Sequence, residues 1–335
     1  MLFKSLKLGK LTLQNRVVMA PMCMFMARDG KPDAFHRTHY AARSLGGVGM
    51  IIIEATSVAK NGYILPSDLA IYDEKQTHAH RKLVKAIKRQ SKSVVCVQLA
   101  HAGAKSSHKS NVSPSGLAFS NKLPQPKELK RDEIHEIVRK FKKAAHNAKK
   151  AGYDIVELHA AHGFLINEFL SPLTNQRNDE FGGSSERRMR FLELIMDEIA
   201  KIIPFGVRLS CDEWEQGGNS IDDAIAIAKI CEQKGAYYIH ASAGGVVPNA
   251  SKMPELKPLY QAHYAKAIKE NINIPVIAVG LITTGKQGEQ LLNDGYCDLV
   301  AYGRELLRNP NFVYSAAKEL NNENYIIKPY ESAFK

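Results

Sequence analysis

The segment Ile155-Val-Glu-Leu-His-Ala-Ala-His-Gly163 decides the fold prediction, because it combines one short buried-type strand with polar residues at its end. Residues 155–160 contain the β-branched and apolar side chains that are typical of a strand in a parallel sheet covered by helices. An amphipathic stretch precedes the strand and another one follows it. The segment therefore predicts one unit of an alternating β/α fold.

The same alternation recurs along the chain, and eight strand-like runs can be counted. The runs are residues 16–22, 48–55, 94–99, 155–160, 206–211, 237–241, 275–279 and 299–302. Helical stretches are expected at residues 78–90, 132–151, 185–203, 220–234, 260–271 and 285–293. Eight β/α units in one chain predict an α/β protein built as a single (β/α)8 TIM barrel.

Two connections are longer than a barrel needs. Residues 102–129 and 163–184 are rich in Ser, Pro, Asn and Gly, so we expect them to be loops over the C-terminal mouth of the barrel. No linker or internal repeat divides the chain, which predicts one domain over residues 1–335. The tail at residues 321–335 lacks helical periodicity, and we expect it to be non-helical and to pack on a neighbouring subunit.

Composition and charge limit the class of protein. The 44% hydrophobic and 24% charged content is that of a globular domain. No run approaches the roughly 18 apolar residues of a membrane span, and residues 1–10 do not resemble a signal peptide. We therefore expect a cytoplasmic protein without membrane contact. The net charge of +12 favours either nucleic acid or an anionic cofactor and substrate. Because the lysines are spread along helix-like stretches, we expect a solvated basic surface and no nucleic-acid partner.

The cysteines argue against a metal site. There are five, and none is spaced as CxxC, which predicts reduced thiols. His159 and His162 stand three apart at a strand end, and no third ligand is evident, so we expect no metal. A satisfied structural pair and a pair of donors for a substrate oxygen remain the two alternatives, and the second is favoured. Cys23 is either a packing residue or a thiol that tunes the reduction potential of a cofactor.

Polar residues at strand ends predict where a cofactor binds. Arg208 would lie inside the barrel, where a guanidinium is costly unless an anion meets it. An internal ion pair with Glu54 or Glu157 is one answer. The other is a reduced, anionic flavin, whose pyrimidine edge would also suit the donors and acceptors of Gln98.

Glycines after the last two strands predict a phosphate site. Gly280 follows the seventh strand, and Gly303 and Arg304 follow the eighth, which is where such barrels commonly bind phosphate. Ordinary turn glycines and a surface arginine are the alternative. Phosphate binding is favoured because both segments occupy the expected place.

The chain resembles the old yellow enzymes, in particular the shorter bacterial subclass of thermophilic-like ene-reductases. The resemblance covers nearly the whole chain. The motifs that carry it are Asn15-Arg-Val-Val-Met-Ala-Pro-Met-Cys23, Gln98-Leu-Ala-His-Ala-Gly103, Glu157-Leu-His-Ala-Ala-His-Gly163, Leu170-Ser-Pro-Leu-Thr-Asn-Gln-Arg177, Asp179-Glu-Phe-Gly-Gly-Ser184 and Gly303-Arg-Glu-Leu306.

The resemblance implies FMN as cofactor, NADPH or NADH as reductant, and a homo-oligomer, either dimer or tetramer. It implies hydride transfer to the flavin and then to an activated alkene, a quinone or a nitro compound. His159 and His162 would bind the substrate oxygen, with Cys23 near the flavin. The implied flavin contacts are Ala20, Pro21, Met22, Cys23, Ala55, Gln98, Arg208, Gly280, Gly303 and Arg304.

Four departures from the family pattern concern the substrate. Phe25 and Phe164 stand where typical members have tyrosines, and the second of those tyrosines is commonly the proton donor. Ala104 and Ser332 stand where typical members have arginines. A phenyl ring donates no proton, so we expect a more apolar pocket and slower alkene reduction, with quinone and nitro reduction retained.

Two other functions compete with this one. A non-catalytic flavin sensor would use Cys23 as a redox switch. An RNA-modifying flavin barrel would need a catalytic cysteine after the third strand and a C-terminal helical domain, and the sequence shows neither. No GxGxxG follows a strand, so we expect the nicotinamide to bind without a domain of its own.

Overall fold

The computed structural model describes residues 1–334 and shows eight parallel strands that close into a barrel. The strands follow one another around the barrel in sequence order, and the last pairs with the first. They are β3 (Val17–Met19), β4 (Met50–Ser57), β6 (Val94–Ala100), β9 (Ile155–Ala160), β10 (Phe205–Ser210), β11 (Ile239–Ser242), β12 (Val276–Ala278) and β13 (Leu299–Tyr302). Each predicted run overlaps one of these strands, so the predicted α/β barrel is confirmed.

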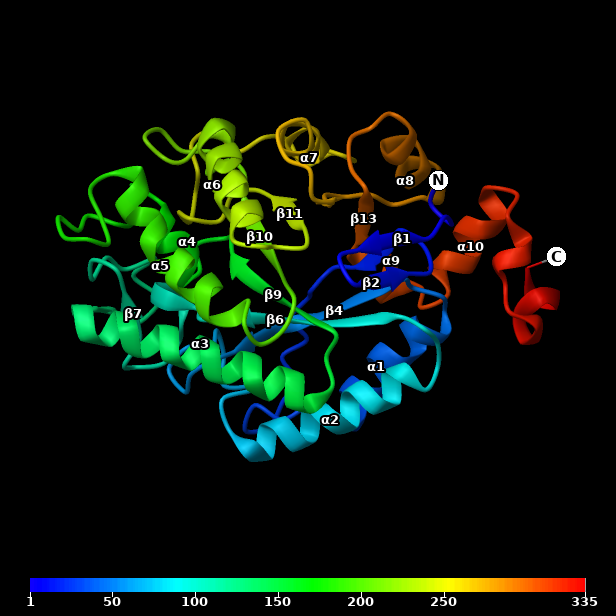
Figure 1. Cartoon of the computed structure of the whole chain (residues 1–335), viewed down its shortest axis with the longest axis horizontal. Coiled ribbons are helices and arrows are strands. Elements are labelled where there is room, and N and C mark those ends of the chain that lie inside the picture. The colour runs from blue at the N-terminus through cyan, green and yellow to red at the C-terminus, as the bar shows by residue number, and fades with distance from the viewer. Residues whose placement is uncertain (335) are drawn as a thin grey trace.

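Helices surround the barrel and fill the connections between its strands (Figure 1). They are α1 (Ala34–Leu45), α2 (Glu74–Lys88), α3 (Arg131–Ala151), α4 (Leu165–Leu170), α5 (Ser185–Ile199), α6 (Ile221–Gln233), α7 (Ala262–Lys269), α8 (Gly285–Asn293), α9 (Arg304–Arg308) and α10 (Phe312–Glu319). The six predicted helices are present with shifts at their ends. Helix α1 is less apparent from the sequence, because its buried face includes His36, His39 and Arg43 rather than an apolar stripe.

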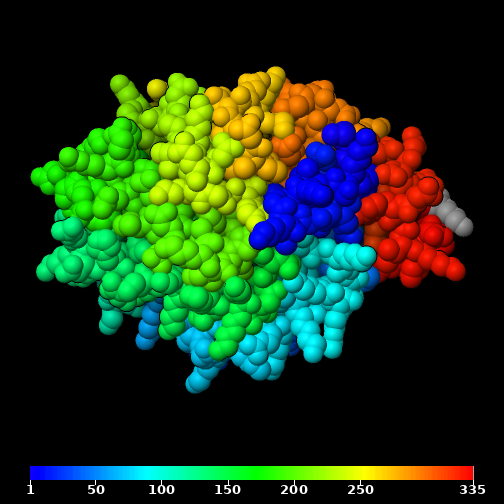
Figure 2. Space-filling model, in the orientation of Figure 1, coloured from blue at the N-terminus to red at the C-terminus, as the bar shows by residue number. Residues whose placement is uncertain are grey.

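An N-terminal hairpin closes the bottom of the barrel. Strands β1 (Leu6–Leu8) and β2 (Leu11–Leu13) pair antiparallel. Leu8 and Leu13 are fully buried and pack with residues inside the barrel such as Ile52. Figure 2 shows this segment in blue across the face turned to the viewer. The site must therefore lie at the opposite, C-terminal end of the strands.

The two long connections contain short elements of their own. The first holds a 3₁₀ turn (Gly103–Lys105), β7 (Val112–Ser113) and β8 (Lys127–Glu128), and the second holds α4. Strand β5 (Leu69–Ala70) adds to the sheet beside β4. The elements of the two connections follow strands β6 and β9 at their C-terminal ends, so the connections form a wall over the mouth.

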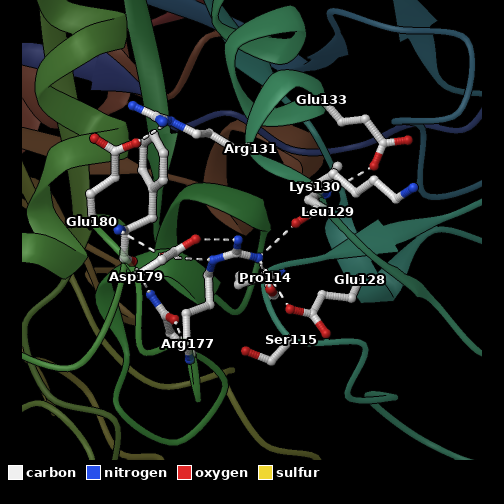
Figure 3. Close-up of polar contacts among 12 residues, drawn as sticks. Pro114, Ser115, Glu128, Leu129, Lys130, Arg131, Glu133, Arg177, Asp179 and Glu180 are labelled. Atoms are coloured by element: carbon white, nitrogen blue, oxygen red, sulfur yellow. Dashed lines mark hydrogen bonds and ion pairs between the residues drawn. The ribbon is translucent and has the colours of Figure 1, made fainter.

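Arg177 ties the two long connections together (Figure 3). Its side chain is only 7% exposed. The guanidinium donates to the carbonyl oxygens of Pro114 and Leu129, both at 2.7 Å, across the gap between the connections. It also holds both carboxylate oxygens of Asp179, at 3.0 and 2.6 Å. Because Arg177 satisfies both carbonyls and the carboxylate, it fixes the wall over the barrel mouth.

The C-terminal tail differs from its prediction. Residues 321–334 contain two 3₁₀ turns, Glu323–Tyr325 and Lys328–Ala333, where a non-helical tail was expected; Lys335 lies outside the described residues. The tail packs on α10 of its own chain, where Tyr314 contacts the rings of Tyr330 and Phe334. A 3₁₀ turn needs only i→i+3 bonds and shows no 3.6-residue pattern, so helical periodicity does not reveal it.

Replacing Arg177 tests its role in the wall. Arg177→Ala leaves two carbonyls without this donor and the Asp179 carboxylate with the Phe181 amide but no cation, so we expect the free energy of unfolding to fall by about 3 kcal/mol. Chemical denaturation measures this change. Arg139→Ala is the matched control, because Arg139 pairs with Glu136 on the surface of α3 and its loss should cost less than about 0.5 kcal/mol. Equal effects of the two substitutions would contradict a special role for Arg177.

Candidate functional site

The interior of the barrel changes from apolar to polar toward its mouth. Val94 and Cys96 of β6 lie in the apolar cluster above the hairpin, and Gln98 comes two residues later. Ile155 and Glu157 repeat this order in β9. Side chains alternate along a strand, so Gln98 and Glu157, which are partners in register, point inward as well. A polar layer therefore lies directly above the apolar one.

Glu157 organises this polar layer. Its carboxylate accepts hydrogen bonds from Gln98 Nε2 at 2.8 Å and from the Tyr238 hydroxyl at 3.1 Å. His240 Nδ1 lies 2.9 Å from the same carboxylate. Burial opposes ionisation, but His240, Arg208 and Gln98 outweigh it and lower the pKa of Glu157 below its ordinary value. Glu157 is therefore a buried carboxylate that fixes the orientation of the Gln98 amide.

Arg208 is a buried cation without a direct partner. It is 9% exposed, and within residues 1–334 it forms no hydrogen bond or ion pair; its Nε is buried and unbonded. The ion pair with Glu54 or Glu157, the alternative that the sequence left open, is absent, although the field of Glu157 still reaches Arg208. An unpaired buried charge lowers the folding stability by roughly several kcal/mol. Arg208 therefore fits the anionic edge of a ligand that enters the barrel mouth.

A cavity of about 520 Å³ lies at this mouth, within the size range of small-molecule sites. Arg208, Arg304 and Arg308 line it, together with one carboxylate, Glu305, which is paired with Arg308. The predicted cofactor residues among its lining are Ala20, Pro21, Met22, Arg208, Gly280, Gly303 and Arg304. The excess of positive charge fits a phosphorylated ligand.

Gly280 is required by the backbone at this cavity. Its φ is +132°, and a Cβ there would lie 2.4 Å from Gln261 Cγ. Only glycine adopts this φ without strain and has no Cβ to clash with Gln261. Without a side chain at this position, a ligand in the cavity can approach the backbone closely. Gly303 precedes the short helix α9 and lines the cavity beside Met22. Together with Arg304, these glycines provide the backbone and side-chain donors that a phosphate group needs.

His159 and His162 lie together at the end of β9, with ring centroids 5.2 Å apart and rings nearly perpendicular. Burial, and then the charge of Arg208, hold the pKa of both well below the ordinary value, so both rings are neutral. His159 Nδ1 accepts from the Ala161 amide at 3.3 Å, which leaves its proton on Nε2. His162 Nε2 lies 2.7 Å from Ser242 Oγ, and His162 lines the cavity. Two neutral imidazoles can donate hydrogen bonds to one ligand oxygen.

Cys23 is a protonated thiol. Burial, Asp68 and Glu54 all raise its pKa above the ordinary value, while the Ala55 backbone opposes this shift. Glu54 itself is held by the Tyr40 hydroxyl at 2.7 Å and the Met24 amide at 3.1 Å. Cys23 and Ala55 are therefore brought together by the fold, but neither lines the cavity. The raised pKa disfavours the thiolate that a redox switch needs.

The two phenylalanines occupy different places. The Phe164 ring packs edge-on against His159 with centroids 4.3 Å apart, and the residue is buried at the start of α4. Phe25 is 38% exposed, and within residues 1–334 it makes no ring contact with either histidine. The structure thus brings Phe164, but not Phe25, against the histidine pair.

Three residues of the site are not apparent from the sequence. Arg308 and Tyr260 line the cavity, and Lys105 contacts the histidine segment. Arg308 stands four residues after Arg304, a spacing that places two residues on one helix face and could have revealed it. Tyr260 and Lys105 carry no such signal, because the fold alone brings their segments to the mouth.

Neither a metal centre nor a membrane span is found within residues 1–334. No group of three or more histidine, cysteine, aspartate or glutamate side chains is arranged there to hold a metal ion. No helix in that part of the chain has the length and apolar character to cross a membrane.

A closed barrel with a basic, glycine-lined cavity at its C-terminal mouth defines a barrel enzyme that binds a phosphorylated cofactor. Residues 1–323 match the family model described as "NADH:flavin oxidoreductase / NADH oxidase family". The chain belongs to this family, that of the old yellow enzymes. It is an NAD(P)H-dependent oxidoreductase with FMN as cofactor, as the sequence predicted.

Relatives and solved structures agree with this assignment. An NADPH dehydrogenase of Geobacillus thermodenitrificans is 44% identical, and the match covers 92% of each chain. An NADPH dehydrogenase of Bacillus subtilis is 42% identical over 96% of each chain. Among structures, morphinone reductase has a TM-score of 0.83 and 27% identity, over 99% of this chain and 92% of its own. A 2-naphthoyl-CoA reductase complex is 24% identical with a TM-score of 0.89, over 96% of this chain and 52% of its own, which shows the shared fold.

Replacing Arg208 separates its effect on the stability of the protein from its effect on FMN affinity. Arg208→Met removes a buried charge that has no direct partner, so we expect the FMN-free protein to unfold at a higher denaturant concentration than wild type. The same change should weaken FMN binding by about 10- to 100-fold, which corresponds to roughly 1.4–2.7 kcal/mol. Flavin fluorescence titration measures the affinity. A destabilised FMN-free variant with unchanged FMN affinity would show that Arg208 serves the fold alone.

Proposed function

We propose that this enzyme reduces small molecules whose double bond or ring is activated by an oxygen-bearing group: enones and maleimides, quinones and nitro compounds. The neutral histidine pair beside the cavity carries the proposal. A carbonyl or nitro oxygen accepts hydrogen bonds, and it becomes more negative as a hydride reaches the carbon chain. Donors placed at that oxygen stabilise the transition state more than the ground state.

We propose that the remaining site residues bind the FMN cofactor. FMN, when bound, supplies the chemistry of accepting and passing on a hydride. Its contacts would be Ala20, Pro21, Met22, Cys23, Ala55, Gln98, Arg208, Gly280, Gly303 and Arg304. Arg208 and Gln98 would meet its polar ring edge, and the arginines and glycines of the cavity would meet its phosphate. The positive potential of this cavity supports the assignment.

Phe164 shapes the substrate end of the site in this proposal. Its ring packs edge-on against His159 and is buried, so the wall beside the substrate oxygen is apolar. An apolar wall strengthens the hydrogen bonds of the histidines by excluding water. It offers no hydroxyl for protonation of the substrate, so alkene reduction depends on water or on another side chain.

Two half-reactions test the proposed function. The purified protein should show a flavin absorption band that NADPH bleaches under anaerobic conditions. Mixing the reduced protein with 2-cyclohexenone, a maleimide, a quinone or a nitroarene should restore the band. His159→Ala should slow the return with cyclohexenone by about 10²-fold, as expected for loss of one donor to a developing oxyanion. A reduced protein that none of the four acceptors reoxidises would refute the proposal.

Restoring a hydroxyl at the apolar wall tests the role of Phe164. Phe164→Tyr places a phenol beside His159, and we expect reoxidation by 2-cyclohexenone to become about tenfold faster because the phenol can donate a proton. Reoxidation by a quinone should not change. Phe35→Tyr, at an exposed site on α1, is the control. If the cyclohexenone rate of Phe164→Tyr equals that of wild type, proton delivery does not limit alkene reduction.

A further inference from the structure

Lys105 stands at the substrate end of the site, although the sequence does not single it out. Its Nζ donates to the carbonyl oxygen of His162 at 2.6 Å and to that of Gly245 at 2.5 Å. These carbonyls belong to the segments that follow β9 and β11. The lysine therefore links two walls of the barrel mouth next to the histidine pair.

Aromatic rings and a glycine hold the side chain there. Nζ lies 4.2 Å from the ring centroid of Phe119 and 5.8 Å from that of Phe164, whose other neighbour is His159. Gly163 has a φ of +68°, and a Cβ on it would lie 3.1 Å from Lys105 Cε and 2.5 Å from the Gly245 carbonyl oxygen. Glycine at this position thus leaves the passage for the lysine side chain. The ammonium group is placed beside the ring that lacks a hydroxyl.

The number of protons on Lys105 exceeds the number of its acceptors. An ammonium group has three N–H bonds, and two of them meet the carbonyls of His162 and Gly245. No third acceptor for Nζ is found within residues 1–334. If the third proton leaves, the neutral amine still has two N–H bonds for the two carbonyls. Loss of one proton therefore breaks no hydrogen bond of the resting structure.

The surroundings make this loss feasible near neutral pH. Burial lowers the pKa of Lys105 to about 8, and Glu168 opposes the shift. Glu168, on α4, accepts from the Ala104 amide at 2.9 Å, and burial raises its own pKa well above the ordinary value. His159 and His162, beside the two carbonyls, are neutral, and Glu157 and His240 on the same strands are paired with each other. Glu168 is the carboxylate that acts on Lys105, and it forms no hydrogen bond or ion pair with Nζ within residues 1–334.

We propose that Lys105 is the proton donor for the α-carbon of activated alkenes, in place of the tyrosine hydroxyl that Phe164 lacks. This inference rests on the proposed function. A hydride originating from NAD(P)H forms the new C–H bond at the β-carbon, and the electron pair of the C=C bond moves toward the substrate oxygen as an enolate. The α-carbon then takes a proton from Lys105 Nζ as the carbonyl re-forms. Water returns a proton to the amine.

Two substitutions separate proton donation by Lys105 from its hydrogen bonds to the carbonyls of His162 and Gly245. Lys105→Met removes both. Lys105→Arg keeps a cation with donors for the two carbonyls, but a guanidinium does not release a proton near neutral pH. We expect both variants to be reoxidised by 2-cyclohexenone about 10²-fold more slowly than wild type. Reoxidation by a quinone should be unchanged, because its protons go to oxygen atoms that exchange directly with water. Lys109→Met, at an exposed neighbouring lysine, is the control.

A rescue and a labelling measurement complete the test. Phe164→Tyr in the Lys105→Met background should restore the cyclohexenone rate of the single Phe164→Tyr variant. In the wild-type protein, acetylation of Lys105 by acetic anhydride, followed by mass spectrometry, should rise with a midpoint near pH 8. The wild-type cyclohexenone rate should fall as the pH rises through the same value, because the protonated form is the donor. FMN content and the thermal unfolding midpoint of Lys105→Arg should match wild type.

Three outcomes would overturn the inference while leaving the proposed function intact. The first is a Lys105→Arg variant with the wild-type cyclohexenone rate. The second is an equal loss with cyclohexenone and quinone, which indicates a purely structural role. The third is a double variant that stays slow. By contrast, a wild-type reduced protein that no alkene reoxidises would overturn the proposed alkene reduction, and the role of Lys105 with it.

Discussion

A buried guanidinium without a direct counter-ion is the constraint on which the site depends. Arg208 sits inside the barrel, above an apolar layer and beside a carboxylate whose bonds go to other partners. Such a charge is unfavourable in the protein alone and becomes favourable when an anion enters. The same charge helps to keep both histidines neutral, as their proposed role as hydrogen-bond donors requires. One residue thus prepares both the cofactor end and the substrate end of the mouth.

Rigidity is distributed unevenly around that charge. The polar layer is built on strands, where the ladder fixes Gln98, Glu157 and Arg208 relative to one another. Apart from His159 on β9, the substrate end is built on the two long connections, which have few strand pairings of their own. There, hydrogen bonds from side chains hold the backbone in place. Arg177 joins the two connections to each other, and Lys105 joins the segments that follow two strands. The precision of the substrate end therefore depends on a buried and a half-buried cation, Arg177 and Lys105, that donate to backbone carbonyls.

Cofactor chemistry and proton delivery are separable in this chain. Three features fit FMN: a basic cavity, a glycine whose backbone conformation and close contacts exclude a side chain, and an oriented amide. The wall where typical members of the family carry a hydroxyl has a phenyl ring instead. A lysine with a spare proton lies beside that ring. Such an arrangement keeps the hydride path of the family while assigning the proton to a different group.

The sequence by itself determined the eight strands, most of the helices, the family and the cofactor, because these depend on local patterns and ordered motifs. It also pointed to Arg208 and the two histidines, since polar side chains at the ends of buried strands are costly unless a ligand or a partner meets them. Only the tertiary structure decided that Arg208 lacks an ion pair, that Cys23 is a protonated thiol, and that Phe25 stands apart from the histidines. It alone brought Lys105 to Phe164, and the tail onto α10. Each of these depends on contacts between segments distant in the chain, which no local pattern records.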